Sequence, residues 1–470
     1  MPNETIDLVD ERDAVIGETT MYRVHRTGEL HRAAHVFVFN SKREIFLQLR
    51  PKTKLLSPGV WDSSVGEHVK RSESFEAAAM RGLEEELNIK NMRVSFVGEK
   101  KVCNKTSKYN NCEFSQLFEC VFDGEIKISK PELEDGRFFS IENAKELIKQ
   151  KKTSNAFKEL LPFYLEKKEE FEKRTDWPFA SVIIATFNNA RVLERVLHGM
   201  LALDYPRDKV EIIVASDGST DATAQLMKKK LGKEKRIKFL DLPHAGVCKA
   251  RNAAIAAASE KNGIVVNMDH DCIPEKQWLK KIVSGFDSTN VGVVSSYNYY
   301  GGTSTAFRKD LLDKVQGYSE EYFYYREDTD LSFKIMDLGF AFRLVQADFE
   351  HDHKIAKPKG ILGLAKHLLQ RLRYHENDVL LYKKHQTKVC KEFLQIKLGF
   401  LVSPISDFRA ATGTWHKGGK LKASSPRGIT FIENKTPLHT VLIIILGICY
   451  AIALKLFRFW GSIKFWKFLI

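Results

Sequence analysis

Two carboxylates stand two residues apart at Asp269 and Asp271, directly after the apolar run 264–268. Carboxylates at this spacing beyond a buried strand can reach one cation, and their oxygens are the ligands that Mg²⁺ prefers. A cation held there can neutralise the charge of a departing diphosphate. Because an Asp-x-Asp pair is also frequent by chance, it predicts a metal site only together with the segments around it.

A second acidic segment, DGSTD at 217–221, follows the apolar run 210–215 and opens a helical pattern. Such a turn offers backbone amides and a helix N-terminus to an anion, and it offers Asp217 to a base or ribose. A plain helix cap by Ser219 or Thr220 is the alternative interpretation.

A third acidic pair, Glu327 and Asp328, precedes the helical pattern 331–340. Acidic residues at a helix start often only compensate the helix dipole. A carboxylate beside an acceptor hydroxyl can instead act as a general base.

Alternating strand and helix patterns must position these side chains. Apolar runs predict strands at 181–186, 210–215, 237–240, 264–268 and 291–297, and helical patterns fill most of the gaps, beginning with 191–201. This alternation predicts an α/β domain.

The order and spacing of these segments resemble the inverting family 2 glycosyltransferases over about residues 178–355. The resemblance is carried by VIIATFNN, ASDGSTD, HAGVCKARN, NMDHD, GGTSTAFRKD and REDTDLSFKIMDLGF. It implies a GT-A, Rossmann-like nucleotide-diphospho-sugar transferase fold and transfer of a sugar with inversion, dependent on Mg²⁺ or Mn²⁺.

The same resemblance implies roles for single residues. Asp328 is the expected catalytic base, with Glu327 as its neighbour. The nucleotide-sugar would be bound by Thr186, Asn188, Asp217, Arg251 and Asp269. The metal would be held by Asp269, Asp271 and His351, with His353 as an alternative to His351.

The N-terminal region has a carboxylate run at 84–86 near the end of a helical pattern that starts at Ser74. Such a run is usually a solvated helix face. The surrounding stretch, however, resembles the Nudix box, Gx5Ex7REUxEExGU with U apolar. The matching residues are Glu73, Arg81, Leu83, Glu85, Glu86 and Ile89, and the departures are Glu67, Gly82 and Asn88. The resemblance implies a Nudix α/β/α fold, and the lost carboxylate at 82 predicts weakened or altered hydrolysis.

The segments ELHRAAHVFVFN, LQLRPKTK and GVWDSSVGEH resemble the isopentenyl-diphosphate isomerase branch of that superfamily. In that branch His31, His68 and Glu113 would bind metal, whereas ordinary core or surface histidines are the alternative. Because Gly66 stands at the catalytic cysteine position, we expect a diphosphate-binding or diphosphate-hydrolysing domain and no isomerisation.

The net charge of +14 suits anionic partners, which are nucleic acid, an anionic membrane or phosphorylated substrates. No recognisable nucleic-acid module accompanies the charge, so we expect no nucleic-acid partner. Seven scattered cysteines without a CxxC pair predict reduced thiols and a cytosolic compartment.

Residues 438–454 contain no acidic or basic side chain apart from His439. With their apolar flanks they approach the ~20 residues that cross a bilayer. We expect a transmembrane helix at 437–457 and an interfacial tail at 458–470, rich in Phe, Trp and Lys; a buried core helix is the alternative. The basic region 361–436 is either an amphipathic surface segment or a set of packed helices.

The predicted organisation is a Nudix-like domain at 1–172 and a transferase domain at 178–360, then the basic region, the transmembrane helix and the tail. The predicted function is transfer of a sugar from a nucleotide-diphosphate donor to an acceptor hydroxyl at the cytosolic face of a membrane. The sequence leaves the acceptor open among a lipid phosphate, a glycan and a protein glycan. The alternative function is a Nudix-type hydrolase whose transferase domain binds sugar nucleotides without turnover.

Overall fold

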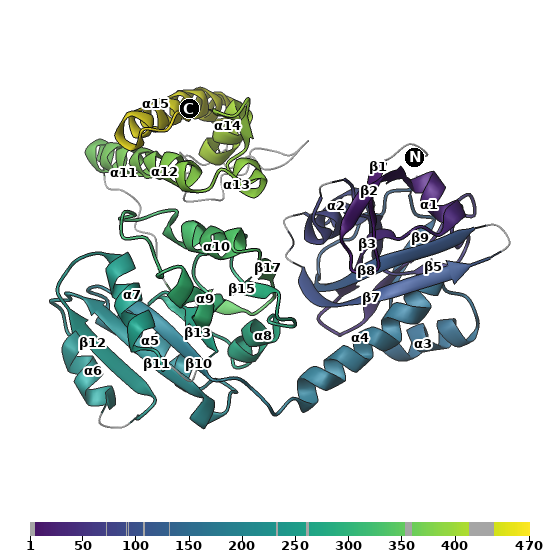
Figure 1. The fold of residues 1–470 in the computed structure, drawn as a ribbon, viewed down its shortest axis with the longest axis horizontal. Helices are drawn as coiled ribbons and strands as arrows, with labels where there is room; N and C mark the ends of the chain where they lie inside the picture. The colour runs from purple at the N-terminus through teal and green to yellow at the C-terminus, as the bar shows by residue number, and fades with distance from the viewer. Residues whose placement is uncertain are drawn as a thin grey trace. The chain divides into compact units, whose positions relative to one another are not determined.

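The computed structural model describes residues 5–71, 73–90, 92, 94–106, 109–130, 132–231, 234–259, 263–352, 360–412 and 437–470. They form two compact units, one of residues 1–177 with 343–347 and the other of residues 178–342 with 348–470 (Figure 1).

A mixed sheet with helices on both faces builds the first unit. Its elements are β1 (Thr5–Val9), β2 (Val15–Thr20), α1 (Met21–Thr27), β3 (His31–Phe39), β4 (Ile45–Leu49), β5 (Trp61–Asp62), β6 (Val65–His68), α2 (Phe75–Leu87), β7 (Ser95–Lys105), β8 (Asn110–Val121), β9 (Asp135–Phe139), α3 (Ile141–Lys149) and α4 (Asn155–Lys173). The strand order is β5-β4-β3-β8-β7, with β6 paired to β3 and β9 to β4.

Strand β3 shows why helices cover both faces of this sheet. Val36 and Val38 pack in one core with α2, whereas Phe37 and Phe39 pack in another core with α4. Successive side chains of a strand point to opposite faces, so a strand that is apolar at every position must be covered on both sides. The result is the predicted α/β/α arrangement.

Cys103 and Cys112 face each other across β7 and β8 and form a disulfide. The expectation that all cysteines are reduced is therefore wrong for this pair. The sequence spacing did not reveal it because the two residues meet only through the register of the hairpin.

The second unit is built around another seven-stranded sheet. Its elements are β10 (Ala180–Thr186), α5 (Ala190–Leu201), β11 (Val210–Asp217), α6 (Thr223–Leu231), β12 (Ile237–Leu242), α7 (Val247–Ala257), β13 (Ile264–Asn267), β14 (Cys272–Pro274), α8 (Trp278–Ser284), β15 (Val291–Ser295), β16 (Thr305–Arg308), α9 (Lys309–Lys314), α10 (Glu327–Asp337), β17 (Ala341–Leu344) and β18 (Phe349–His351). The order is β12-β11-β10-β13-β16-β15-β17, and β10 to β13 run parallel.

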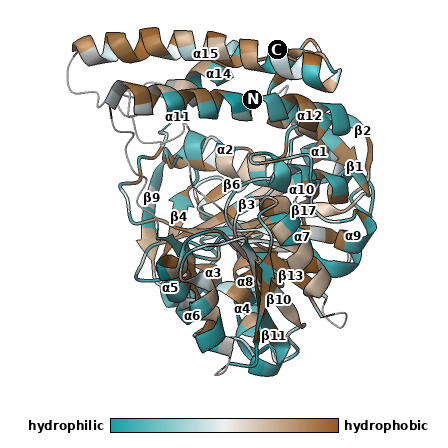
Figure 2. Cartoon of the chain, turned by 90° about the vertical axis from the view of Figure 1, so that its left-hand side faces the viewer, coloured by the Kyte–Doolittle hydropathy of each residue, from teal (hydrophilic) through white to brown (hydrophobic). Residues whose placement is uncertain are grey.

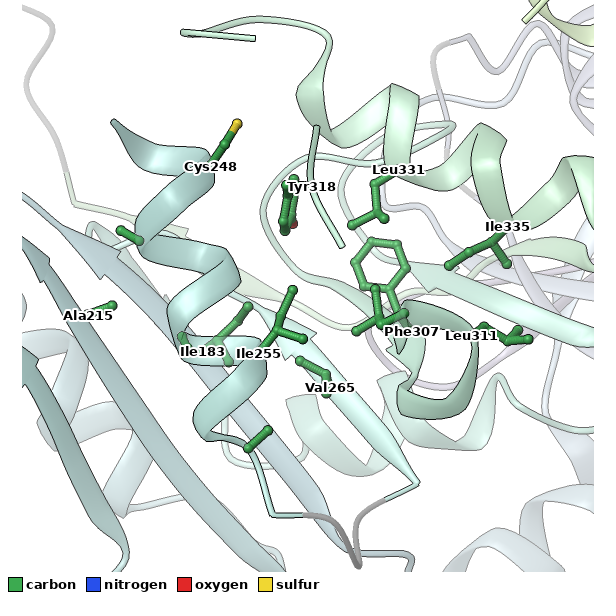
Figure 3. Close-up of a cluster of buried hydrophobic side chains, with 14 of the residues drawn as sticks. Ile183, Ala215, Cys248, Ile255, Val265, Phe307, Leu311, Tyr318, Leu331 and Ile335 are labelled. Atoms are coloured by element: carbon green, nitrogen blue, oxygen red, sulfur yellow. The ribbon is translucent and has the colours of Figure 1, made fainter. Parts of the chain in front are cut away.

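The core of this sheet is drawn in Figure 3. Ile183 and Val265 of the parallel strands share a buried cluster with Ile255 of α7, Phe307 of β16 and Leu331 of α10. This packing attaches both α7 and α10 to the sheet face, so side chains carried by the two helices are held at defined positions.

Helices dominate the rest of the second unit. They are α11 (Gly360–Tyr374), α12 (Glu376–Lys384), α13 (Lys388–Phe393), α14 (Pro404–Thr412) and α15 (Pro437–Phe465), with the short strands β19 (Ile396–Lys397) and β20 (Leu401–Val402). Within the described residues, α15 contains a stretch, 440–465, that is long and apolar enough to span a membrane. The helix continues eight residues beyond the end expected at 457, and Arg458, in this extension, is buried against carboxylates of neighbouring helices. Residues 413–436 of the predicted basic region 361–436 lie outside the described residues.

Candidate functional site

The carboxyl ends of three neighbouring parallel strands bring together residues that are far apart in sequence. Thr186 ends β10, Asp217 ends β11 and Asp269 follows β13. In open α/β sheets ligands bind at this edge, where the strand order reverses. The reversal occurs at β10, which lies between β11 and β13.

Asp217 is held in place by the turn that precedes α7. Its Oδ1 accepts hydrogen bonds from the amides of Ala245 (2.7 Å) and Gly246 (3.1 Å), and its Oδ2 lies 3.0 Å from Nδ1 of His244. The following Gly218 has φ +71°, and a Cβ there would come within 2.6 Å of the His244 amide nitrogen. Only glycine therefore fits this close approach. His244 was not predicted from the sequence, because it reaches Asp217 from 27 residues away.

Asn188 joins two loops at the same edge. Its Oδ1 accepts hydrogen bonds from the backbone amides of Thr220 (2.7 Å) and Asp221 (3.3 Å), and its backbone N–H donates to Oγ of Ser219 (3.0 Å). The predicted nucleotide-site residues Asn188 and Asp217 thus border one rigid pair of loops.

Arg251 connects the three acidic residues that the sequence singled out. Its Nη2 lies 3.0 Å from Oδ1 of Asp269, and its Nη1 lies 3.3 Å from Oε1 of Glu327 and 3.1 Å from Oδ1 of Asp328. Arg251 and Glu327 are 5% and 4% exposed, so the charges meet where water screens them poorly. Arg251 thus links the acidic residue after β13 electrostatically to the two acidic residues at the start of α10.

Asp328 titrates near neutrality. Burial raises its pKa to about 7, the Arg251 guanidinium opposes the rise, and the carboxylates of Glu327 and Asp269 add to it. A carboxylate poised near neutral pH is suited to accept a proton. The backbone of Gly301 lies against it, since a Cβ at 301 would come within 2.8 Å of the Asp328 carbonyl oxygen.

Asp269, Asp271 and His351 converge as predicted ligands. One ligand atom from each, together with Sγ of Cys272, lies within 4.8 Å of the others. Strand pairing explains the approach of His351, because β14 and β18 place it opposite Cys272. Burial raises the pKa of the Cys272 thiol, so the two carboxylates and the imidazole are the ligands available to a cation. This oxygen-rich set fits Mg²⁺ or Mn²⁺. His353 lies outside the described residues.

The first unit holds a second cluster of possible ligands. His31 and Glu113 are register partners on the parallel strands β3 and β8, and His68 ends β6, which also pairs with β3. His25 of α1 completes the group, with its Nε2 2.9 Å from Nε2 of His68. The sequence analysis missed His25, because it sits on a helix outside the segments that carried the resemblance.

Burial favours the neutral form of His25 and His31 in this cluster. His31 Nδ1 donates to the Glu29 carbonyl (3.1 Å), so the lone pair of a neutral ring is on Nε2, which is buried and has no hydrogen-bond partner in the described chain. Burial lowers the pKa of His31, and burial together with His31 lowers the pKa of His25 to about 4. Neutral histidines are the form that ligates metal.

The Nudix-like residues surround Arg81. It makes two hydrogen bonds to Glu73, both 3.0 Å, and one to Glu67 (2.7 Å), and it lies 3.6 Å from Glu85. A Cβ at Gly82 would come within 2.6 Å of Cγ of Glu67. Two of the three departures from the motif therefore fit each other, because Glu67, together with Val65 (2.3 Å), fills the space that a side chain at 82 would need.

Glu86 lies deepest in this group. It is 7% exposed, and burial and the carboxylate of Glu67 hold its pKa well above the usual range. The structure thus places a carboxylate at 67 beside Glu86, although the motif position at 82 carries none.

Comparisons with known proteins match both units. Residues 181–352 match the model of glycosyl transferase family 2, and residues 29–161 match that of the NUDIX domain. Glycosyltransferase AglE of Haloferax volcanii is 31% identical over 143 residues, which are 30% of this chain and 46% of that protein. This chain therefore spans less than half the length of that relative.

Isopentenyl-diphosphate Delta-isomerase 2 of Photorhabdus laumondii is 34% identical over 150 residues, which are 31% of this chain and 82% of that protein. Among solved structures, the mannosyltransferase PcManGT from Pyrobaculum calidifontis, in complex with GDP-Man and Mn²⁺, is 19% identical. The match covers 64% of this chain and 94% of that chain, with a TM-score of 0.43. The predicted resemblances are confirmed: the chain contains a segment that matches glycosyl transferase family 2 and, N-terminal to it, a NUDIX domain related to isopentenyl-diphosphate isomerases. The mixed α/β sheets of the two units agree with the predicted fold class.

Proposed function

We propose that residues 178–360 transfer a sugar from a nucleotide-diphosphate donor to an acceptor hydroxyl, with inversion and with a divalent cation. The observation that carries the proposal is the link through Arg251, which joins Asp269 of the ligand group to the near-neutral Asp328. The buried guanidinium of Arg251 thereby sets the positions of Asp269, which would face the donor diphosphate, and of Asp328, which would face the acceptor.

The transfer itself needs one proton acceptor. As the acceptor oxygen forms its bond to the anomeric carbon, its proton passes to a carboxylate oxygen of Asp328. The bond from the anomeric carbon to the diphosphate breaks, and its electron pair leaves on the diphosphate oxygen. Attack from the face opposite the leaving group inverts the configuration. Positioning by Arg251 and Glu327 keeps Asp328 in place for this step.

Mg²⁺ or Mn²⁺ held by Asp269, Asp271 and His351 would supply charge neutralisation for the diphosphate. Thr186 and Asp217 lie at the same edge of the sheet, where we place the nucleotide. The acceptor stays open among a lipid phosphate, a glycan and a protein glycan.

We further propose that the protein is attached to a membrane through α15, with both domains on the cytosolic side, where sugar nucleotides are made. The long apolar stretch of α15 supports attachment. The placement is tested by adding protease to intact cells: cleavage of either domain from outside would contradict it.

Nucleotide release from a panel of UDP-, GDP- and dTDP-sugars with Mn²⁺ or Mg²⁺ tests the activity. Detergent-purified full-length protein is compared with Asp269→Ala and Glu86→Ala variants. We expect release to be lost in Asp269→Ala and kept in Glu86→Ala. Release that survives Asp269→Ala and disappears in Glu86→Ala would make the Nudix domain the working enzyme and would overturn the proposal.

A second activity is proposed for residues 1–172, which would bind or hydrolyse a diphosphate compound. The group of His25, His31 and His68 favours this activity, with Glu113 3.8 Å from Nε2 of His31, because that Nε2 has no hydrogen-bond partner in the described chain. Manganese binding by full-length Asp269→Ala protein isolates this site. We expect a further His31→Asn change to abolish the remaining binding; unchanged binding would contradict the assignment.

A further inference from the structure

Helix α15 has two different faces along its whole length. One stripe is buried from the first turns to the last, at Ile443, Gly447, Tyr450, Leu454, Arg458 and Ser462. These positions recur every three or four residues, so they form one side of the helix. The stripe packs against α11, α12 and α14, and Figure 2 shows α15 lying alongside α11.

The opposite stripe is exposed and apolar. It consists of Ile445, Ile448, Ile452, Leu456, Phe459 and Ile463, each about half exposed. A soluble monomer rarely exposes so long a continuous apolar surface without a partner. Trp460 and Trp466 are also exposed near one end, and tryptophan is enriched at the boundary between lipid and water.

Two basic residues in the second half of α15, Lys455 and Arg458, point into the protein. Arg458 pairs with Asp378 (3.0 Å) and Asp407 (2.8 Å), and Lys455 pairs with Asp407 (3.0 Å). These ion pairs leave the exposed stripe without charge. They also attach α15 to α12 and α14, which carry the acidic partners.

Both ends of α15 stay on the same body. Near its start, Ile443 packs with Leu372 of α11. Beyond its end, Leu469 is fully buried in a cluster with Phe333 of α10, the helix that begins at Glu327. A helix that crosses a bilayer has its ends separated by ~30 Å of hydrocarbon. For α15 to cross, its helical neighbours and their buried ion pairs would have to enter the hydrocarbon, which is costly.

Helix α11 shares the same kind of surface. Leu362, Lys366, Leu369 and Arg373 recur at helical spacing, and all four are exposed. Leucines that alternate with basic residues on one face suit the boundary of an anionic leaflet. The charge of the chain, +14, agrees with an anionic surface as the partner.

We propose that α15 lies flat in the surface of an anionic bilayer, with its apolar stripe among the acyl chains, and does not cross to the other side. The proposal rests on the proposed membrane attachment and specifies its geometry. Asp378 of α12 accepts a hydrogen bond from Arg326 (2.7 Å), which directly precedes α10. Helix α12, which packs against α15, therefore also supports the start of α10. An acceptor at the membrane surface would therefore reach the site from a defined side.

The sidedness of Lys464, near the end of α15, tests the geometry. Its side chain is half-exposed and pairs with Glu376 of α12 (3.2 Å). Full-length Lys464→Cys, with the exposed Cys449 changed to serine, is labelled with a membrane-impermeant maleimide in right-side-out and inverted membrane vesicles. Protease cleavage of the transferase domain defines the orientation. We expect labelling only in vesicles where that domain is cut. Labelling in the opposite orientation, or in neither, would overturn the proposal.

Flotation with vesicles of phosphatidylglycerol and phosphatidylcholine tests the partner. We expect Ile448→Glu with Ile452→Glu to reduce the floated fraction at least tenfold. Ile16→Glu makes the same change at an isoleucine that is exposed on the first unit, and it should float like the wild type. Equal flotation of all variants, or a dimer that dissociates in the double variant without any lipid binding, would overturn the proposal. Nucleotide release measured on the same samples separates this result from failure of the proposed transfer activity.

Discussion

Removing the charge of Glu327 should shift the pH dependence of sugar transfer without changing the shape of the site. Glu327 and Asp328 both contact Nη1 of Arg251, at 3.3 and 3.1 Å. Their oxygens therefore lie within about 6 Å of each other, where two unit charges at an effective dielectric constant of about 20 repel by about 2–3 kcal/mol. Since about 1.4 kcal/mol corresponds to one pH unit, Glu327→Gln should move the titration of Asp328 by about two pH units.

The sign of the shift follows from the role of the base. Asp328 accepts a proton only when it is ionised, so kcat/KM should rise as the pH passes its pKa, which is about 7 in the free protein. The negative charge of Glu327 raises that pKa. Glu327→Gln should therefore move the acid limb of the profile to lower pH, whereas Arg251→Met, which removes a positive charge, should move it to higher pH.

The assay is nucleotide release from the preferred donor between about pH 5 and about pH 9, at constant Mn²⁺ concentration, fitted for the acid limb. Glu194→Gln, an exposed carboxylate on α5, is the matched control and should leave the limb in place. The maximal kcat/KM can fall in any variant without affecting the test, which depends only on the pH of the acid limb. An acid limb that stays fixed or moves to higher pH in Glu327→Gln would refute Asp328 as the base.

Three further outcomes are expected. In the His31→Asn background, which removes the manganese site proposed for the first unit, Asp271→Asn should weaken Mn²⁺ binding by about tenfold or more, measured by electron paramagnetic resonance; unchanged affinity would exclude it as a ligand. Arg458→Met leaves Asp378 buried without this cation and should lower the free energy of unfolding by about 3–5 kcal/mol, measured by urea titration; an unchanged midpoint would contradict the ion-pair account. Gly301→Ala, at φ +115°, pushes against the Asp328 carbonyl and should reduce transfer at least tenfold while circular dichroism stays unchanged; full activity would show that the backbone there can move.

Regular patterns in the sequence predicted most of the second unit. The apolar runs at 181–186, 210–215 and 237–240 lie within β10, β11 and β12, and the run 264–268 contains β13. A strand buried on both faces is apolar at every position, so it is visible without any partner. The DGSTD and DHD segments stand at the ends of such strands, and this placement made the candidate site predictable.

Contacts made through strand register and helix packing were not predictable. His25 joins His68, and His244 joins Asp217, across 43 and 27 residues. The fit of Glu67 into the space beside Gly82 likewise depends on how β6 packs against α2. Neither residue type nor spacing along the chain reports which surfaces of two elements face each other.

The sequence by itself determined the two family resemblances, the two α/β architectures and the residue types that could perform the chemistry. It did so because periodic burial and motif spacing are local properties of the chain. Only the tertiary structure decided that Arg251 gathers Asp269, Glu327 and Asp328 around one charge, and that Lys455 and Arg458 of α15 turn inward. Those outcomes depend on low-dielectric contacts between distant segments, whose strength exists only once the chain has packed.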